Sequence, residues 1–419
     1  MKRLSGKTAE KVLRAAKIGA VAGFALQAAA IATVVAVDER RKRREPSSGQ
    51  FPHVPPTDAH VADSTLTTYT YGNDLFEDML AAIDAATETV YFETFIWKKD
   101  ETGRRFREAI IRAARRGVDT YVIVDSFGNL NQDPRFRRFP KLDTLHVLRF
   151  PLFRWGLLTG SMRNSGRDHR KLLVTDSSTA FVGGYNIGSL YAEHWRDTHL
   201  RIVGPQVWEL ENAFIDMWNS HRPRGEARIA NPPPEDWTAE IRAIQNLPSR
   251  LSYPIRSSYL DALDRSRDHA WITMGYFIPD RDMQESLIEA ARRGVDVRIL
   301  VPEYSNHIIA DWVGRPHFSS MMEAGVRIFL FESAMVHSKT MTMDGKWSTI
   351  GTANIDRLSM QGNFEINVEI FSKEQAQIME EIFRVDLTNA HELTRQEWER
   401  RPAGARLIER ILRPLGIIL

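Results

Sequence analysis

The sequence predicts an α/β protein in which two homologous α/β/α domains follow one N-terminal transmembrane helix. Three observations predict this architecture: a repeated strand–helix–strand pattern, a repeated set of polar residues, and an uncharged segment near the start of the chain. The chain has 419 residues, too many for one ordinary core and enough for two domains with an additional segment. It contains no Cys, which excludes disulfide bonds, thiolate metal ligands and a cysteine nucleophile.

The uncharged segment covers residues 18–37, a length that can cross a bilayer as a helix. Six Lys or Arg residues precede it and five, at residues 40–44, follow it, so charge counts barely decide its orientation. The basic cluster after the segment favours a cytoplasmic body, because anionic lipids attract such clusters. We therefore predict a single-pass anchor in the cell membrane within residues 1–57, of which 45–57 form a linker. A cleaved signal peptide and an interfacial or soluble helix are the alternatives.

Charge is distributed unevenly along the chain. The first 50 residues carry 11 basic and 4 acidic residues, whereas the remainder carries 45 basic and 50 acidic residues. A slightly acidic body is a poor general binder of nucleic acid, because neutralisation of phosphates dominates that affinity. We expect a membrane as a partner, and no nucleic acid. The sequence does not predict an oligomeric state.

A seven-residue stretch at 113–119 recurs without change at 290–296. Each copy ends an amphipathic helical pattern and lies between two apolar, strand-like segments. These segments are residues 90–97, 121–124, 270–277 and 298–301. The order strand, helix, strand predicts βαβ units and a largely parallel sheet. We predict a first domain at 58–222, a Pro-rich linker at 223–235 and a second domain at 236–419.

Each predicted domain also contains one copy of a polar motif, His-x-Lys-x4-Asp. The copies are His169, Lys171 and Asp176, and His337, Lys339 and Asp344. The agreement continues 14, 17 and 28 residues after each histidine. Those positions hold Gly183 and Gly351, Asn186 and Asn354, and Asp197 and Glu365.

These residue types suit a phosphodiester. Alternate residues of a strand share one face, so the histidine and lysine of each motif point the same way. Lysine neutralises phosphate oxygens, and asparagine adds a neutral donor for charge that grows in the transition state. One histidine can attack phosphorus while the other protonates the leaving alcohol and then activates the acceptor. No metal or other cofactor is expected.

The remaining residues have supporting roles in this interpretation. Asp197 and Glu365 are candidates to bind the far imidazole nitrogens, which would fix the tautomer and support the imidazolium. Asp176 and Asp344 are predicted to belong to the catalytic set, with an equally weighted alternative in which each ends a strand or binds backbone. The two glycines are expected where the backbone comes close to another group.

The paired motifs resemble those of the phospholipase D superfamily, and within it the chain is most similar to bacterial cardiolipin synthases. The resemblance covers about residues 65–419. Its supporting stretches are residues 96–103, 183–188, 195–197, 275–280 and 363–367. It implies two domains related by a pseudo-two-fold axis, one active site between them, a phosphatidyl-histidine intermediate and no metal. The chain departs from the synthase pattern at Arg357 and Leu358, where the usual arginine is displaced by one position.

In many members of the superfamily the histidine of the first half is the nucleophile. That match implies attack by His169 and general acid and base catalysis by His337, although the two half-sites alone do not distinguish the histidines. The expected reaction is phosphatidyl transfer between two phosphatidylglycerols, giving cardiolipin and glycerol. Hydrolysis to phosphatidic acid differs only in how well the pocket excludes water. A nuclease-type phosphodiesterase and a non-enzymatic scaffold are weaker alternatives, because the body is acidic and both half-sites are intact.

Overall fold

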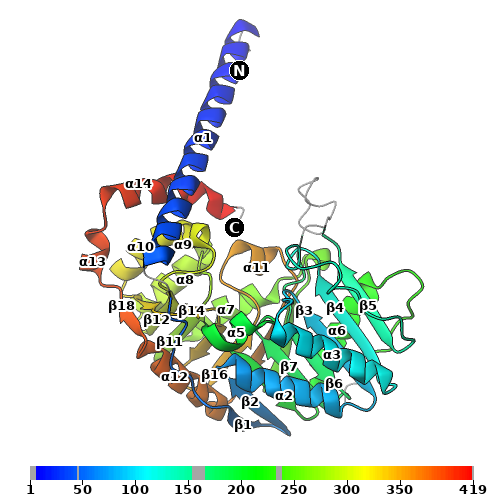
Figure 1. Ribbon diagram of the computed structural model, residues 1–419. Helices are drawn as coiled ribbons and strands as arrows, with labels where there is room; N and C mark the ends of the chain where they lie inside the picture. Colours follow the sequence, from blue (N-terminus) through cyan, green and yellow to red (C-terminus); the bar gives the residue numbers. More distant parts are fainter. Residues whose placement is uncertain (1–5, 45–46, 153–165, 233–237, 418–419) are drawn as a thin grey trace.

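The computed structural model describes residues 6–44, 47–152, 166–232 and 238–417. Two α/β halves lie side by side, and one long helix rises from the second half (Figure 1).

The first half is built on an eight-stranded sheet with the order β1-β2-β9-β7-β6-β3-β4-β5. Its strands are β1 (Thr57–Val61), β2 (Ser64–Tyr69), β3 (Thr89–Thr94), β4 (Asp119–Asp125), β5 (Leu145–Phe150), β6 (Leu172–Thr175), β7 (Thr179–Gly183) and β9 (His199–Val203). Strands β3, β4 and β5 run parallel, and the other neighbours run antiparallel.

The second half repeats this arrangement in a sheet of order β10-β17-β16-β15-β11-β12-β13-β18. Its strands are β10 (Ile241–Asn246), β11 (His269–Met274), β12 (Asp296–Pro302), β13 (Arg327–Phe331), β15 (Lys339–Met343), β16 (Trp347–Gly351), β17 (Glu365–Ile370) and β18 (Ala390–Glu392). The order from β10 to β13 matches that from β2 to β5 strand for strand, which confirms the predicted duplication of an α/β domain.

The prediction of a largely parallel sheet was wrong, because both sheets are mixed. Only the three strands around each repeated stretch are parallel. The strands that follow the histidines, β6 and β15, pair antiparallel with β7 and β16. Each pair is joined by a turn of three residues, 176–178 or 344–346, and so short a connection can join only antiparallel strands.

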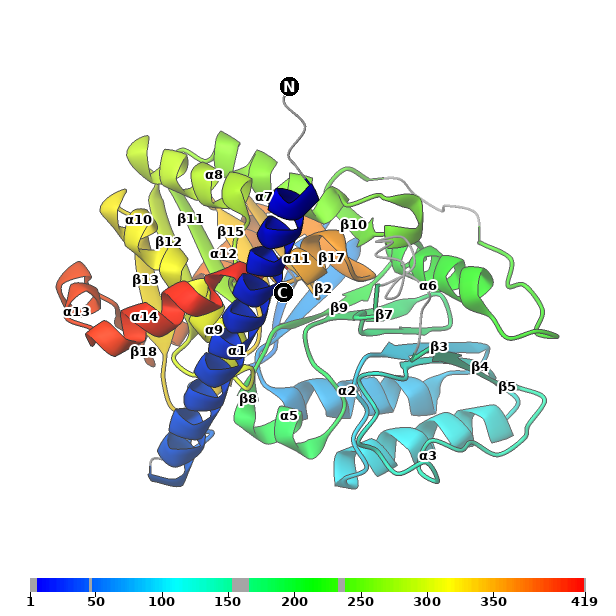
Figure 2. The ribbon, with the colours of Figure 1, turned by 90° about the horizontal axis from the view of Figure 1, so that it is seen from above.

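Helices cover both sheets (Figure 2). Those of the first half are α2 (Gly72–Ala85), α3 (Glu101–Arg115), α5 (Ser189–His194) and α6 (Val207–His221). Those of the second half are α7 (Pro254–Arg265), α8 (Arg281–Arg292), α9 (Ile308–Gly314), α10 (Phe318–Glu323), α11 (Arg357–Gln361), α12 (Lys373–Leu387), α13 (Arg395–Glu399) and α14 (Ala403–Leu412). The repeated stretch ends α3 and α8. Its glycines, Gly117 and Gly294, adopt φ of 95° and 94°, a left-handed conformation that strongly favours glycine.

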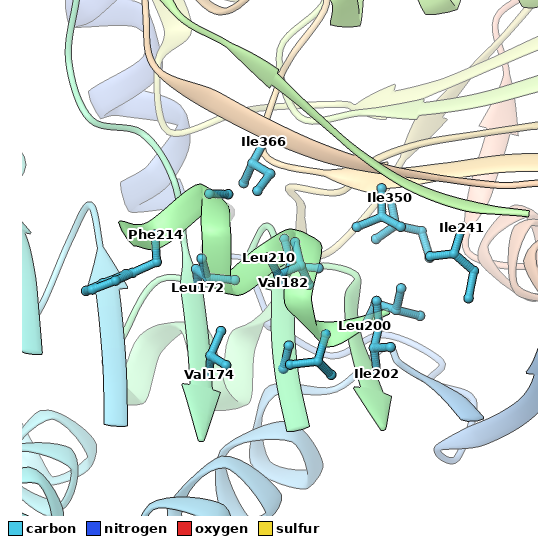
Figure 3. Packing of buried hydrophobic residues seen from close by; sticks show 14 of the residues in the cluster. Leu172, Val174, Val182, Leu200, Ile202, Leu210, Phe214, Ile241, Ile350 and Ile366 are labelled. Atoms are coloured by element: carbon cyan, nitrogen blue, oxygen red, sulfur yellow. The ribbon is translucent and has the colours of Figure 1, made fainter. Parts of the chain in front are cut away.

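The two halves share a hydrophobic core where their sheets meet (Figure 3). Leu172, Val182 and Leu200 of the first sheet belong to the same buried cluster as Ile350 and Ile366 of the second. Because β6 and β17 both contribute to this cluster, packing holds the two predicted half-sites against each other.

Helix α1 (Gly6–Arg44) is a single helix of 39 residues. In the described part of the chain, no helix is both long and apolar enough to cross a membrane. The end of α1 packs against α9 and α14, with Ala30, Val34 and Asp38 buried. The predicted span at 18–37 overlaps the part of α1 that packs against α9 and α14. Of the predicted linker at 45–57, residues 47–56 have no regular secondary structure, Thr57 begins β1, and 45–46 lie outside the described residues.

Candidate active site

The two histidines pair with carboxylates of the opposite half. His169 lies just before β6, and its Nδ1 is 3.0 Å from both carboxylate oxygens of Glu365, the first residue of β17. His337 lies just before β15, and its Nδ1 is 2.6 Å from Asp197 Oδ2. Because Nδ1 of each ring faces a carboxylate, Nε2 is left as the nitrogen that can react. Each half-site is therefore completed by the other domain.

Backbone hydrogen bonds fix these crossed pairs in register. The amide of His169 donates to the carbonyl of Phe364, at 3.0 Å, and the amide of His337 donates to the carbonyl of Arg196, at 2.7 Å. The second contact extends a small parallel sheet of β8 (Trp195–Arg196) and β14 (Met335–Val336). The first extends an isolated parallel bridge between Asp168 and Phe364. Each histidine is thus tied to the residue that precedes the carboxylate it binds.

The two motif lysines are buried beside the histidines. Lys171 Nζ donates to the carbonyl of His169, at 2.6 Å, and Lys339 Nζ donates to the carbonyl of His337. Burial lowers the pKa of Lys171 to about 8. Burial, together with the charge of Lys171, lowers the pKa of Lys339 to about 7 despite the opposing effect of Asp197.

The histidines respond to the same surroundings. Burial lowers the pKa of both rings. For His337, the charges of Lys339, Lys171 and His169 lower it further. Four groups that can carry positive charge therefore share one buried space, and an anion placed among them would raise all four pKa values. A phosphodiester is an anion of this kind.

Additional donors hold the carboxylates. Burial raises the pKa of Asp197 to about 6, although the amide of Thr198 donates to its Oδ1 at 2.7 Å. Thr352 Oγ1 donates to Glu365 Oε2 at 2.6 Å. We did not predict a role for Thr352. Thr352 lies fifteen residues after His337, and its counterpart Gly184 lies fifteen residues after His169. This equal spacing could have pointed to both positions.

The asparagines are anchored by their oxygens. Asn186 Oδ1 accepts from the amide of Ile96, and Asn354 Oδ1 accepts from the amide of Tyr276, both at 3.2 Å. Both side chains are buried. With each oxygen occupied, the Nδ2 group is the part that can donate to a ligand. A role in binding phosphate stays a prediction.

The two motif glycines allow close approach to a neighbouring strand. A Cβ atom at Gly183 would lie 2.6 Å from Cα of His199, and one at Gly351 would lie 2.2 Å from Oδ1 of Asn367. The expected close approach is present, and it serves strand packing behind the carboxylates. Gly184, which we did not predict, touches the site itself, because a Cβ atom there would lie 2.0 Å from Asp197 Oδ1.

Asp176 and Asp344 require a correction, since the structure places both away from the histidines. Asp176 lies at the opposite end of β6 from His169, and its carboxylate accepts from three successive amides, 87–89, at 2.8 to 2.9 Å. Asp344 accepts from amides 267–269 at 2.9 to 3.0 Å. Both aspartates have positive φ, at 48° and 52°. They fix the start of β3 and β11, which is the structural alternative that the spacing left open.

Aromatic rings distinguish the two histidines. Phe95 meets His169 edge to face, with ring centroids 4.8 Å apart. His337 instead contacts Trp195 at 5.1 Å and Tyr276 at 5.7 Å. The side chain of His169 is 12% exposed and that of His337 is 4% exposed. The pseudo-symmetric site therefore has one more accessible histidine, and it is the histidine of the first half.

Two buried arginines link the halves behind the site. Arg170 binds Glu93 through two hydrogen bonds, at 3.0 and 2.6 Å, and Gln245 of the second half at 2.9 Å. Arg196 binds Asp386 of α12 at 2.8 and 2.9 Å. Each arginine neighbours a catalytic candidate in the sequence, so these pairs help to hold the crossed contacts.

The fold and site together define a class: a two-domain enzyme with paired histidines that acts on phosphodiesters. Within the described residues, no group of three or more His, Asp or Glu residues lies close enough together to bind a metal ion.

Comparison with known proteins identifies the family. The family model described as "Cardiolipin synthase, PLD-like domain" matches residues 79–218 and 259–387. A cardiolipin synthase of Clostridium perfringens is 32% identical over 360 residues, which cover 82% of this chain and 75% of the relative. A cardiolipin synthase of Staphylococcus aureus is 31% identical over 369 residues, covering 86% and 74%.

Solved structures show the same fold. Phosphatidylserine synthase of Haemophilus influenzae aligns with a TM-score of 0.62 at 13% identity, covering 90% of this chain and 98% of that structure. Polyphosphate kinase of Porphyromonas gingivalis aligns with a TM-score of 0.54 at 13% identity, covering 85% and 53%.

The chain belongs to the phospholipase D superfamily and, within it, to the cardiolipin synthase family of phospholipase D-like domains. It is a phospholipase D-type phosphatidyltransferase.

Proposed function

We propose that the protein synthesises cardiolipin from two molecules of phosphatidylglycerol and releases glycerol. The observation that carries this proposal is the crossed arrangement of two histidine–carboxylate pairs around a space shared by two buried lysines. Such an arrangement supplies a nucleophile and a separate general acid and base for one phosphodiester. The similarity to two named cardiolipin synthases over most of the chain supports the choice of substrate.

In the first step, Nε2 of His169 attacks the phosphorus of a phosphatidylglycerol. The bond between phosphorus and the glycerol headgroup oxygen breaks, and His337 donates its proton to that oxygen. The products are free glycerol and a phosphatidyl group bound to His169. The greater exposure of His169 and the resemblance to the superfamily both support this assignment of the nucleophile. Lys171 and Lys339 stabilise the charge on the phosphoryl oxygens.

In the second step, His337 removes the proton from a headgroup hydroxyl of a second phosphatidylglycerol. That oxygen attacks phosphorus, the bond between phosphorus and His169 breaks, and cardiolipin leaves. Asp197 stabilises the imidazolium that His337 becomes at this point, and Glu365 does so for His169 during attack. Both histidines end in their starting protonation states.

The proposal also places the enzyme at the cell membrane, with α1 as a single-pass anchor and the body on the cytoplasmic side. The uncharged residues 18–37 and the basic residues 40–44 support this placement. Cell fractionation followed by protease treatment of intact spheroplasts tests it. Cleavage of the body in intact spheroplasts, or its recovery in the soluble fraction, would contradict the proposal.

The activity is tested by incubating purified full-length protein with phosphatidylglycerol in detergent and resolving the lipids and free glycerol. We expect cardiolipin and glycerol in equal amounts from the wild type. His337→Ala should form cardiolipin far more slowly, because both steps need this residue, and any phosphatidyl adduct in this variant should lie on His169, through a P–N bond that is acid-labile and base-stable. Phosphatidic acid without cardiolipin would instead show hydrolysis, and an adduct on His337 in His169→Ala would reverse the assigned roles.

A further inference from the structure

A cavity of about 620 Å³ adjoins the half of the site that contains His337. It lies at the carboxyl ends of β12 and β13, where α/β sheets commonly bind ligands. The end of α1, helix α9 and the segment around α13 form its other walls. Its volume is sufficient for a small polar headgroup.

One residue connects this cavity to the catalytic group. Gly275 lines the cavity, and a Cβ atom on it would lie 3.2 Å from both His337 Cδ2 and Lys339 Nζ. At the corresponding position of the first half, directly after β3, the chain has Phe95, whose ring packs against His169. The absence of a side chain at Gly275 leaves the cavity next to the general acid and base proposed above.

The equivalent end of the first sheet is more closely packed in its described residues. At the carboxyl end of β4, the strand that corresponds to β12, the void measures only about 20 Å³. Trp97, Phe136 and Phe139 pack together there, with ring centroids 5.8 to 6.1 Å from that of Trp97. The cavity at the end of β12 therefore breaks the symmetry of the site on the side of His337.

Segments outside the family match build much of the cavity wall. The match ends at residue 387, whereas Trp398 and Arg401 line the cavity. The match begins at residue 79, whereas Val34 and Arg41 of α1 line it. The cavity thus arises from additions to the duplicated core, which makes it a place where acceptor specificity can differ between members of the family.

The charges of the cavity favour a neutral ligand over an anion. Arg41 is paired with Asp38 at 2.8 Å, and Arg401 is paired with Glu409 at 3.0 Å. Arg315 lies 3.6 Å from Glu409 and stacks on Trp312. All three guanidinium groups that line the cavity therefore already have a carboxylate partner, so an anionic phosphate gains little there.

The carboxyl groups of the cavity can recognise hydroxyls. Glu303 and Asp311 both line the cavity. Burial raises the pKa of Glu303, and it raises that of Asp311 to about 7. A carboxylate accepts hydrogen bonds from hydroxyls, and a protonated carboxyl group also donates one. Aromatic faces next to such groups are suited to the carbon skeleton of a polyol.

We propose that this cavity is the acceptor subsite, and that it binds the uncharged, hydroxyl-rich glycerol moiety of the accepting lipid and delivers one hydroxyl to His337. The inference rests on the proposed transferase function and adds to it the site that selects a polyol over water or a simple alcohol. Glu303 is a specificity-determining residue in this subsite, because it contacts the acceptor and not the phosphoryl group.

The test compares acceptors in competition. Phosphatidylglycerol is supplied as donor together with deuterated glycerol and deuterated 1-propanol, and three products are quantified: labelled phosphatidylglycerol, phosphatidylpropanol and cardiolipin. Glu303→Met removes both carboxyl oxygens at nearly constant length. Glu289→Met is the control, because Glu289 of α8 is an exposed glutamate of the same half and does not line the cavity. Ala310→Phe fills the cavity without removing a polar group.

We expect Glu303→Met and Ala310→Phe to lower labelled phosphatidylglycerol and cardiolipin about tenfold relative to phosphatidylpropanol, the effect of losing one good hydrogen bond. Glu289→Met should keep the wild-type ratios. Unchanged ratios in both cavity variants, or loss of phosphatidylpropanol in both, would overturn the subsite. If the wild type formed none of the three products, the transferase function itself would fail, which is a separate outcome.

Discussion

Replacing Asp197 by Asn tests the central feature of the site, the carboxylate that reaches the histidine of the other half. The substitution keeps the shape of the side chain and removes its charge. Asp197 Oδ2 lies 2.6 Å from His337 Nδ1, and both side chains are almost fully buried. The variant should therefore fold with the same contacts while losing the negative charge that stabilises the imidazolium of His337.

The expected loss follows from Coulomb's law. Charge centres about 4 Å apart interact by about 4 kcal/mol at the effective dielectric of about 20 that describes protein sites. If the imidazolium forms in the transition state, this energy is lost from transition-state stabilisation, which corresponds to roughly a thousandfold lower kcat. KM should change little, because Asp197 is paired with His337 and has no assigned contact with substrate.

The assay is the initial rate of cardiolipin formation over a range of phosphatidylglycerol concentrations, with a thermal melt for each variant. Asp176→Asn is the matched control: the same substitution at an aspartate that binds the amides of 87–89 at the far end of β6. It should keep kcat within about twofold and lower the stability by about 2–4 kcal/mol, since charge-assisted hydrogen bonds weaken. Near-normal kcat in Asp197→Asn, or a thousandfold loss in Asp176→Asn, would refute the assignment.

Three further predictions follow from the electrostatics of the site. The pH profile of kcat/KM should rise through about pH 6, where Asp197 ionises, and fall at higher pH as the free enzyme loses first the proton of His337, whose pKa is lowered, and then, through pH 7 to 8, the charges of Lys339 and Lys171. The alkaline limb of the kcat profile should lie at higher pH than that of the kcat/KM profile, because bound phosphodiester raises the pKa of both lysines. If the two alkaline limbs lay at the same pH, this prediction would be contradicted. Arg170→Met should destabilise the protein by about 3–5 kcal/mol in urea unfolding, because it leaves Glu93 buried without its partner, and the double variant with Glu93→Gln should recover part of the loss. EDTA should leave the rate of cardiolipin formation unchanged, whereas inhibition reversed by one specific cation would contradict a mechanism carried by histidine and lysine.

Equal spacing in the sequence predicted which residues of the two halves are structurally equivalent, because duplication preserved the spacing. The residues at equal distances from His169 and His337 occupy equivalent places in the two halves. The repeated stretch located βαβ units correctly, since a glycine after a helix and an apolar run after that glycine are local signals. These features depend on residues near one another in the chain.

Features that depend on the meeting of the halves were not predictable from the pattern. Spacing alone does not distinguish two pairings of His169. One is with Asp197 of the same half, and the other is with Glu365 of the opposite half. Only the register of β14 with β8 and the bridge to Phe364 decide it. The mixed sheets were missed for a related reason: apolar runs show where strands lie and not their direction.

The two motif aspartates show why strict spacing does not establish catalysis. A duplicated fold preserves residues that shape the strand ends as faithfully as those that react. Asp176 and Asp344 each bind three amides of the loop before β3 or β11. A structural role of this kind requires a fixed spacing along the chain, and so does a catalytic role. The equal spacing was therefore compatible with both the structural and the catalytic interpretation of the two aspartates.

The buried cations explain why the site needs both halves. Lys171 and Lys339 come from different domains. The charge of Lys171 lowers the pKa of Lys339, and both charges lower the pKa of His337. The free enzyme therefore holds these groups in an unfavourable arrangement, which the shared core and the buried arginine pairs maintain. A phosphodiester relieves that repulsion where it binds, and the negative charge that develops on its oxygens in the transition state relieves it further. Packing of the two domains thus holds the cations together at a cost in folding stability, and their charges stabilise the transition state. Neither half-site could provide this stabilisation alone.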